Sequence, residues 1–302
     1  MTGTAENKAM VAATIGHFFW GLSFLSSRIA LDIAPVIVLL SHRFLLAFAA
    51  MSLLLPTPLG DCHLRGKSLR PLLLLGLMEP VIYFFGELYG ILHSTTIFSG
   101  VMISMIPIFG ILAAIPVLKE TPTAGQMLFS GLSVGGVIGV GLLSRSSGAL
   151  DWIGVAALLV AVFSAVAYML LNRIMGADYT AFERTYGMLA TGAVVFTVMA
   201  LFSVRGDLSA YVKPLTSWRY DAAVVFLAVF CSVVCYFLSC YSLTRLSVAR
   251  ATVFANLTTA VSVIAGALIL HEPLPPLGVV FCALILIGIY GVQRAADPQQ
   301  EP

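Results

Sequence analysis

Residues 95–140 read TTIFSGVMISMIPIFGILAAIPVLKETPTAGQMLFSGLSVGGVIGV: an apolar span, a Leu-Lys-Glu break at 118–120 and a second apolar span rich in glycine. The same order of segments recurs at 251–292, which reads ATVFANLTTAVSVIAGALILHEPLPPLGVVFCALILIGIYGV. A shift of 152 residues, the separation of Glu120 and Glu272, superposes the two copies. The shift also aligns Phe85 with Phe237, Tyr89 with Tyr241, Val101 with Val253, Leu118 with Leu270, Gly136 with Gly288, Gly139 with Gly291 and Val140 with Val292. The chain therefore reads as two copies of one unit.

The composition is that of an integral membrane protein. Of the 302 residues, 60% are apolar and 10% are charged, whereas a soluble protein carries roughly 25% charged residues. The apolar runs are about 20 residues long, enough to cross ~30 Å of hydrocarbon as helices, and they lack the strict alternation of a lipid-facing β-barrel. A net charge of +2 gives no basis for binding nucleic acid. The five cysteines imply neither a disulfide framework nor a metal site, and the first apolar run is too long for a cleavable signal peptide.

Ten membrane spans are predicted, and the connections between them leave no room for a soluble domain. The spans cover 10–31, 35–55, 71–93, 96–118, 124–144, 152–173, 184–204, 219–242, 249–270 and 275–293. Residues 1–147 and 148–302 then hold five spans each. Because five is odd, the second copy enters the bilayer from the opposite face. The predicted fold class is an all-α integral membrane protein of ten transmembrane helices, arranged as two inverted five-helix repeats.

The loop lysines and arginines predict the orientation of the chain. With the N-terminus inside, the inner segments hold ten basic residues and the outer segments five. The inner residues are Lys8, Arg65, Lys67, Arg70, Lys119, Arg173, Arg184, Arg245, Arg250 and Arg294, and the outer ones are Arg28, Arg145, Arg205, Lys213 and Arg219. We therefore expect both termini in the cytoplasm.

Several of these motifs occur together in one known family. They are Arg43-Phe44, Ile106-Pro107, Leu118-Lys119-Glu120, the glycine-rich fifth span and Leu270-His271-Glu272. With them the chain resembles, over nearly its whole length, the drug/metabolite transporter superfamily, specifically its ten-helix EamA-type branch. The resemblance implies outward movement of small metabolites, often amino acids, across the bacterial inner membrane, through a cavity lined by spans one to four and six to nine. One departure is that Pro107 aligns with Thr259, where the family usually keeps a second proline.

Three charged residues lie inside predicted spans. Arg43 is in the second span, and Glu79 and Glu87 are in the third. Each costs roughly 2.5–3.5 kcal/mol at the bilayer centre if it is unpaired. Arg43 and Glu87 lie at comparable depths, so they are read either as a structural ion pair or as a coupling site. For Glu79, which has no cationic neighbour at its depth, we expect a role in binding a substrate amine or a coupling proton.

The first span carries His17 and Trp20 near its middle. A histidine at this depth serves either in a proton relay or as a hydrogen-bond partner of a neighbouring helix. Tryptophan usually sits at the membrane interface, so the N–H of Trp20 is expected to face a cavity or a partner. By the repeat, Tyr168 of the sixth span is expected to face it.

A second polar group is expected around Pro107 in the fourth span. Pro107 removes a backbone hydrogen bond at the bilayer midplane, and Ser104 lies one turn before it. Broken helices at that depth face protein or water. Asn256 and Thr259 occupy the same depth in the second copy. These residues are read either as ligand-binding groups or as hydrogen bonds that hold helices together.

Aromatic residues cluster in the third and eighth spans, and Tyr83 and Tyr236 are the candidates for an apolar ligand wall. Gly131, Gly135 and Gly139 form a GxxxG face, for which helix packing is expected. No phosphate loop or metal-ligand cluster appears in the sequence, so no cofactor is expected.

Together these features predict a secondary transporter and not an enzyme. It would export small amphipathic metabolites such as amino acids by alternating access, with proton coupling through Glu79, Glu87 or His17 as a further hypothesis. The expected partners are the lipid bilayer and a small-molecule substrate, with the chain a monomer or homodimer. Two alternatives stay open: an intramembrane enzyme built on His17 with Glu79 or Ser23, and a passive channel.

Overall fold

The computed structural model describes residues 2–58, 60–93, 102–103, 105–143, 152–269 and 276–295, and no β-strand occurs in these ranges. Within these ranges, six helices are long and apolar enough to cross a membrane, and two shorter apolar helices cover Ile106–Leu118 and Ala124–Gly139. The six are Ala5–Leu31, Val36–Leu53, Trp152–Met175, Ala181–Ser203, Trp218–Leu243 and Pro276–Arg294. The prediction of an all-helical, multi-pass membrane protein is confirmed.

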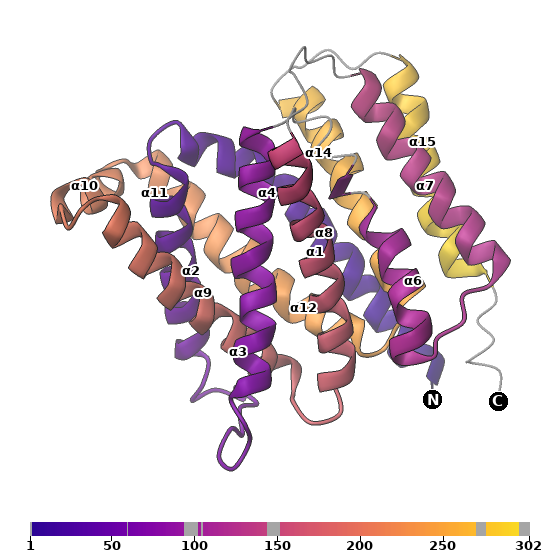
Figure 1. The fold of residues 1–302 in the computed structure, drawn as a ribbon, viewed down its shortest axis with the longest axis horizontal. Coiled ribbons are helices and arrows are strands. Elements are labelled where there is room, and N and C mark those ends of the chain that lie inside the picture. The colour runs from indigo at the N-terminus through magenta and orange to yellow at the C-terminus, as the bar shows by residue number, and fades with distance from the viewer. Residues whose placement is uncertain are drawn as a thin grey trace.

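The two halves of the chain share the order of their long helices, and the second half has two additional short helical elements between its second and third spans (Figure 1). The first half contains α1 (Thr2–Leu31), α2 (Val36–Leu53), α3 (Arg70–Gly76), a π-helical segment (Leu77–Ile82), α4 (Tyr83–Leu92), α6 (Ile106–Leu118) and α7 (Ala124–Leu143). The second half contains α8 (Trp152–Met175), α9 (Ala181–Ser203), α10 (Leu208–Val212), a 3-10 turn (Lys213–Thr216), α11 (Trp218–Val225), a π-helical segment (Phe226–Val234), α12 (Cys235–Leu243), α13 (Val248–Thr252), α14 (Ala255–Ile269) and α15 (Pro276–Arg294). Each half therefore interrupts its third predicted span with a π-helical segment, at positions that the 152-residue shift superposes.

The third span is broken at Glu79. Glu79 has extended backbone angles (φ −141°, ψ 122°) inside the π-helical segment, and Pro80 follows it. The exposed carbonyl of Met78 accepts a hydrogen bond from the Ser164 hydroxyl at 2.5 Å. The sequence also predicted that Pro107 removes a helical hydrogen bond in the fourth span. Pro107 lies instead in the first turn of α6, where a helix needs no amide hydrogen, and α6 begins one residue before it, after a turn at Met105.

Helices that are equivalent under the repeat pack against each other in antiparallel fashion. In the α2–α9 pair, Ser41 contacts Thr197 near one end and Ser52 contacts Tyr186 near the other. In the α7–α15 pair, a Cβ on Gly136 would lie 2.8 Å from the Phe281 carbonyl, and a Cβ on Gly288 would lie 2.7 Å from the Phe129 carbonyl. Phe129 and Phe281 are themselves related by the 152-residue shift, so the seam between α7 and α15 is self-complementary.

The glycines of this seam differ from the predicted set. Gly139 packs against the Phe281 ring and Gly291 against the Phe129 ring, whereas nothing lies within 4 Å of a Cβ on Gly131 or Gly135. The predicted GxxxG face of Gly131, Gly135 and Gly139 is therefore wrong for its first two members. The glycines that the repeat aligns are the ones that allow close approach of the two backbones.

Several charged contacts lie at the end of the molecule where α1 begins. Arg250 of α13 donates to the Glu6 carboxylate near the N-terminus and, at 3.2 Å, to the carbonyl of Ala295. Glu120 after α6 accepts from Arg173 at 3.2 Å and from the backbone N–H of Val248 at 2.7 Å. The loop before α3 also lies at this end, whereas α10 lies at the opposite end (Figure 1). We call the end that holds Glu6, Glu120 and the loop before α3 the N-terminal end.

Candidate functional site

A group of polar side chains surrounds the break in the third span. The Tyr83 hydroxyl donates to Glu87 Oε1 at 3.1 Å, one turn along α4. Tyr236 of α12 lies near the Glu79 carboxyl. Glu79 and Glu87 are close enough to repel each other. Two half-buried carboxyl groups from one half and a buried tyrosine from the other therefore lie in one group.

Tyr236 also connects this group to the first helix. Its ring contacts the Trp20 ring edge-on, with 5.6 Å between ring centroids, and Trp20 contacts the His17 ring at 4.9 Å. Trp20 Nε1 donates to the carbonyl of Cys231 at 2.8 Å. The predicted partner Tyr168 instead bonds Ser239 at 3.0 Å, so the expectation that Tyr168 faces Trp20 is corrected to Tyr236. Tyr168 remains near the group, since it interacts electrostatically with Glu79 and Tyr236.

Arg43 points toward the second π-helical segment. Its Nε donates to Ser232 Oγ at 2.8 Å and an Nη donates to the carbonyl of Cys231 at 3.5 Å. The expected ion pair between Arg43 and Glu87 is not formed by these described residues, although the guanidinium is near enough to attract both Glu79 and Glu87 electrostatically. The side chain is buried, with the Phe44 and Phe84 rings each 5.4 Å from its guanidinium carbon. Arg43 thus links α2 to the second half and supplies a positive charge near the two carboxyls.

His17 makes a helix–helix hydrogen bond. Its Nδ1 lies 3.2 Å from the Thr258 hydroxyl of α14, and Thr258 in turn donates to the His17 carbonyl at 3.3 Å. His17 is partly buried, and its other ring contact is Phe254 at 6.4 Å. Of the two roles considered for His17, this geometry favours contact between α1 and α14.

The residues expected around Pro107 do not join this group. Asn256 is buried and its Nδ2 donates to Ser133 Oγ of α7 at 3.1 Å, on the side of the seam with α15. Pro107 is buried in α6, and Thr259 is half-buried on α14, where its carbonyl accepts a hydrogen bond from the Ser262 hydroxyl at 2.9 Å. Ser104 lies outside the described residues. Asn256 is therefore a contact that holds helices together.

Sequence reasoning missed Cys231 and Ser232 in the second π-helical segment. The Cys231 carbonyl accepts from both Trp20 and Arg43, and Ser232 accepts from Arg43 and donates to the Leu227 carbonyl at 3.0 Å. The 152-residue shift places Cys231 and Ser232 on Glu79 and Pro80. The repeat was therefore the signal that could have found them, had it been followed into the third span.

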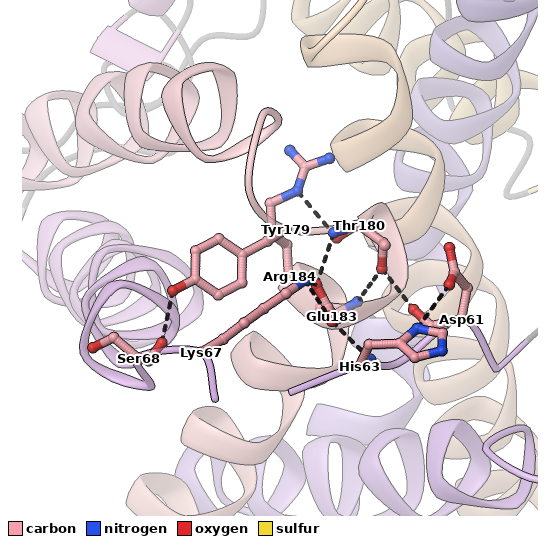
Figure 2. Close-up of polar contacts among 8 residues, drawn as sticks. All are labelled: Asp61, His63, Lys67, Ser68, Tyr179, Thr180, Glu183 and Arg184. Atoms are coloured by element: carbon pink, nitrogen blue, oxygen red, sulfur yellow. Dashed lines mark hydrogen bonds and ion pairs between the residues drawn. The ribbon is translucent and has the colours of Figure 1, made fainter. Parts of the chain in front are cut away.

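A second polar cluster closes the N-terminal end between the loop before α3 and the start of α9 (Figure 2). Glu183 is fully buried, and its carboxylate accepts from Lys67 Nζ at 2.7 Å, from the His63 backbone N–H at 2.8 Å and from the Thr180 backbone N–H at 2.9 Å. The Thr180 hydroxyl accepts from the Glu183 N–H at 3.1 Å, which completes a capping box for α9. The same hydroxyl donates to the Asp61 carbonyl at 2.7 Å. This cluster ties the first half to the second.

Arg184 extends the second cluster inward. It is 2% exposed, and its guanidinium donates to Asn172 Oδ1 at 2.5 Å and to the Cys240 carbonyl at 2.9 Å. Three helices of the second half, α8, α9 and α12, are joined by this one side chain. Within the ranges that the structure describes, no group of three or more His, Cys, Asp or Glu side chains could hold a metal ion.

Comparison with known proteins agrees with the fold and identifies the family. The EamA-like transporter family matches this chain twice, over residues 7–142 and 152–294. The chain is 33% identical over 291 residues to "Uncharacterized transporter YcxC" of Bacillus subtilis (strain 168), covering 95% of this chain and 93% of the relative. It is 27% identical over 290 residues to "Probable terminal-alkyne amino-acid exporter" of Streptantibioticus cattleyicolor, covering 95% of this chain and 94% of the relative.

A solved structure described as "Crystal structure of protein" has the same fold, with a TM-score of 0.77 at 16% identity over 98% of this chain and 99% of that one. The two family matches together cover nearly the whole sequence. The chain belongs to the EamA-like transporter family.

Proposed function

We propose that this protein is a secondary transporter that exports small amphipathic metabolites, such as amino acids, by alternating access. The observation that carries the proposal is the break at Glu79, where an ionisable carboxyl lies near Tyr236 of the other half and near Glu87 and Arg43. Helices broken at membrane depth next to polar groups are the usual form of a transporter site. The relative named as an amino-acid exporter supports the substrate class and the direction.

The proposed architecture is two inverted five-helix repeats, residues 1–147 and 148–302. Three observations support it: the two separate family matches, the antiparallel packing of α2 on α9, and the antiparallel, self-complementary packing of α7 on α15. Equivalent helices of an inverted repeat run in opposite directions, as these two pairs do. Alternating access would then be a rocking of one half against the other around the site at Glu79.

Within the site we assign roles by position. Glu79 binds the substrate amine or the coupling proton, with Tyr236 as its hydrogen-bond partner and Glu87 with Tyr83 as the adjacent group. Trp20 and Tyr168 supply aromatic walls, and Arg43 holds the site between α2 and the second π-helical segment. A bacterial inner-membrane location with both termini in the cytoplasm is part of the proposal, supported by the excess of basic residues at the N-terminal end.

Counterflow in liposomes tests the proposal. Purified protein in vesicles loaded with one unlabelled amino acid at a time should accumulate the same labelled amino acid transiently and saturably. A passive channel gives no such overshoot, and an enzyme gives a converted product, so either result rejects a carrier.

The role of Glu79 is tested with Glu79→Gln, with Asp32→Asn as the matched control because Asp32 is an exposed carboxylate outside the site. Glu79→Gln should lose the dependence of transport on a pH gradient or lose transport, while the control retains both. Unchanged transport with unchanged pH-gradient dependence in Glu79→Gln would show that Glu79 is not the coupling site.

A further inference from the structure

A cavity of about 480 Å³ lies at the N-terminal end, away from the site at Glu79. It is bounded by the loop before α3, the turn between α8 and α9, the first turn of α9 and the last two turns of α12. Its wall combines the aromatic residues Phe182, Phe237 and Tyr241 with the charged residues Asp61, Arg184 and Arg245. A volume of this size accepts a ligand, since small-molecule sites range over roughly 300–1,000 Å³.

Arg245 lines this cavity, and only one nitrogen of its guanidinium donates hydrogen bonds to the described residues. Its charged carbon lies 3.7 Å from the centre of the Tyr241 ring, so the planar group is stacked on the aromatic face. One terminal nitrogen, Nη1, donates to the Tyr241 carbonyl at 3.0 Å and to the Thr244 hydroxyl at 3.1 Å. None of the ion pairs found among the described residues involves Arg245. The guanidinium is therefore oriented by the protein, while Nε and Nη2 form no hydrogen bond with the part of the chain that the structure describes.

The floor of the cavity adds a second, fixed positive charge. Arg184 is 2% exposed and is held by Asn172, Cys240 and the Thr180 carbonyl. Among the described residues Arg184 forms no ion pair, and the acceptors of its guanidinium are carbonyl and amide oxygens. A buried arginine without a counter-ion raises the potential of the cavity above it.

We propose that this cavity binds the phosphate of a phospholipid headgroup from the leaflet at the N-terminal end. Arginine in a planar, stacked setting suits a phosphate, which it can bind through two parallel N–H groups. Basic pockets between transmembrane helices at a membrane surface are typical sites for lipid headgroups. Phe237 and Tyr241 extend the wall along α12 toward the membrane interior, where the first carbons of an acyl chain would lie.

Asp61 makes the proposal more specific. Asp61 lines the same cavity, and its side chain is 61% exposed with the carboxylate 3.3 Å from His63 Nδ1, so the carboxylate lies at the rim of the cavity. It repels a purely anionic headgroup and attracts an ammonium. The pocket therefore favours a headgroup that carries an ammonium beside its phosphate, such as phosphatidylethanolamine, over phosphatidylglycerol. This inference does not depend on the transport activity.

Native mass spectrometry of the delipidated full-length protein tests the site. The protein is titrated with phosphatidylethanolamine, phosphatidylglycerol and diacylglycerol, and the first bound lipid is quantified. We expect phosphatidylethanolamine to bind more tightly than phosphatidylglycerol and diacylglycerol not to bind specifically. Arg245→Gln should weaken the first binding step about tenfold, whereas Arg219→Gln, an exposed arginine at the start of α11, should leave it unchanged. Asp61→Asn should remove the preference between the two phospholipids.

Each outcome supports or overturns the proposal. Equal binding of the first lipid to the wild type and to Arg245→Gln, with both proteins melting at the same temperature, overturns it. Millimolar inorganic phosphate that displaces the lipid completely would assign the pocket to a soluble phosphate compound and overturn the lipid source. If Arg245→Gln fails to fold, Tyr241→Leu, which removes the stacked ring, provides the second test and should weaken binding in the same way.

Discussion

The buried carboxylate of Glu183 makes Lys67 more important for stability than any exposed lysine. Glu183 is 0% exposed while Lys67 is 31% exposed, and the two are 2.7 Å apart. Lys67→Met leaves the carboxylate buried with only the backbone N–H groups of His63 and Thr180. Breaking a fully buried pair costs roughly 3–5 kcal/mol. Because the lysine end of this pair reaches water, we expect about 2 kcal/mol.

A double-mutant cycle isolates the ion pair. Glu183→Gln loses charge-assisted hydrogen bonds, each worth roughly 1.5–3 kcal/mol, but retains the shape of the side chain and one acceptor, so a loss of about 2 kcal/mol is expected. In the Glu183→Gln background no buried charge needs Lys67, and Lys67→Met should then cost less than about 0.5 kcal/mol. The resulting coupling energy of about 1.5 kcal/mol exceeds the usual error of additivity, which is about 0.3–0.5 kcal/mol.

Thermal unfolding in detergent measures these losses through a thiol-reactive dye. Four of the five cysteines are buried and become reactive when the chain unfolds. For a chain of this size, 1 kcal/mol shifts the melting temperature by about 2 °C, so Lys67→Met should lower it by about 4 °C. Lys213→Met, an exposed lysine of the opposite end, serves as the control and should shift it by less than about 1 °C. Equal shifts for Lys67→Met and Lys213→Met, or strict additivity of the double mutant, would refute the argument.

Three further predictions concern the seam, the loop before α3 and Arg43. Gly288→Ala places a Cβ 2.7 Å from the backbone of α7 and should destabilise by about 2–3 kcal/mol, whereas Gly131→Ala, with nothing within 4 Å, should be neutral or slightly stabilising; equal melting temperatures would contradict this. Cys62, the one half-buried cysteine of the five, should react with a membrane-impermeant maleimide in inverted vesicles and not in intact cells. Burial raises the pKa of the Cys62 thiol, so its reaction rate should rise at a higher pH than the reaction rate of a free thiol does. If the midpoint of this rise lies at or below the midpoint for a free thiol, the result would be inconsistent with the buried setting of Cys62. Arg43→Met should abolish transport. Arg43→Lys should retain the charge but lose the bond to Ser232, and this variant should still transport substrate at a reduced rate. Full activity of Arg43→Met in the liposome assay would show that Arg43 is not part of the site.

Much of the fold could be read from the sequence because lipid imposes a simple rule: every backbone group must be satisfied within a helix. The helices α1, α2, α7, α8, α9 and α15 begin and end within a few residues of the predicted spans, except that α1 extends to Thr2. Proline was harder to interpret. Pro80 and Pro107 both fall inside predicted spans, and only the backbone shows that the first follows a break and the second starts a helix.

Some of the residues in the candidate site could be named from the sequence for a different reason. Glu79, Tyr83, Glu87 and Tyr236 could be found because ionisable and aromatic residues are conspicuous in an apolar chain. Depth along a helix is readable from sequence, but the direction in which a side chain points around the bundle is not. Asn256 and His17 lie at plausible depths, yet they face α7 and α14, and Arg43 turns to Ser232 instead of Glu87.

The contact between α7 and α15 has a consequence for the origin of the molecule. Gly288 packs against Phe129 and Ser133 in the same way as Gly136 packs against Phe281 and Ile285, so the two halves contact each other through equivalent surfaces. A surface that fits its own copy is all that a two-fold symmetric dimer requires. A single five-helix ancestor with these glycines would already have carried a pairing face, and joining two such units into one chain would have fixed their association without inventing a new interface.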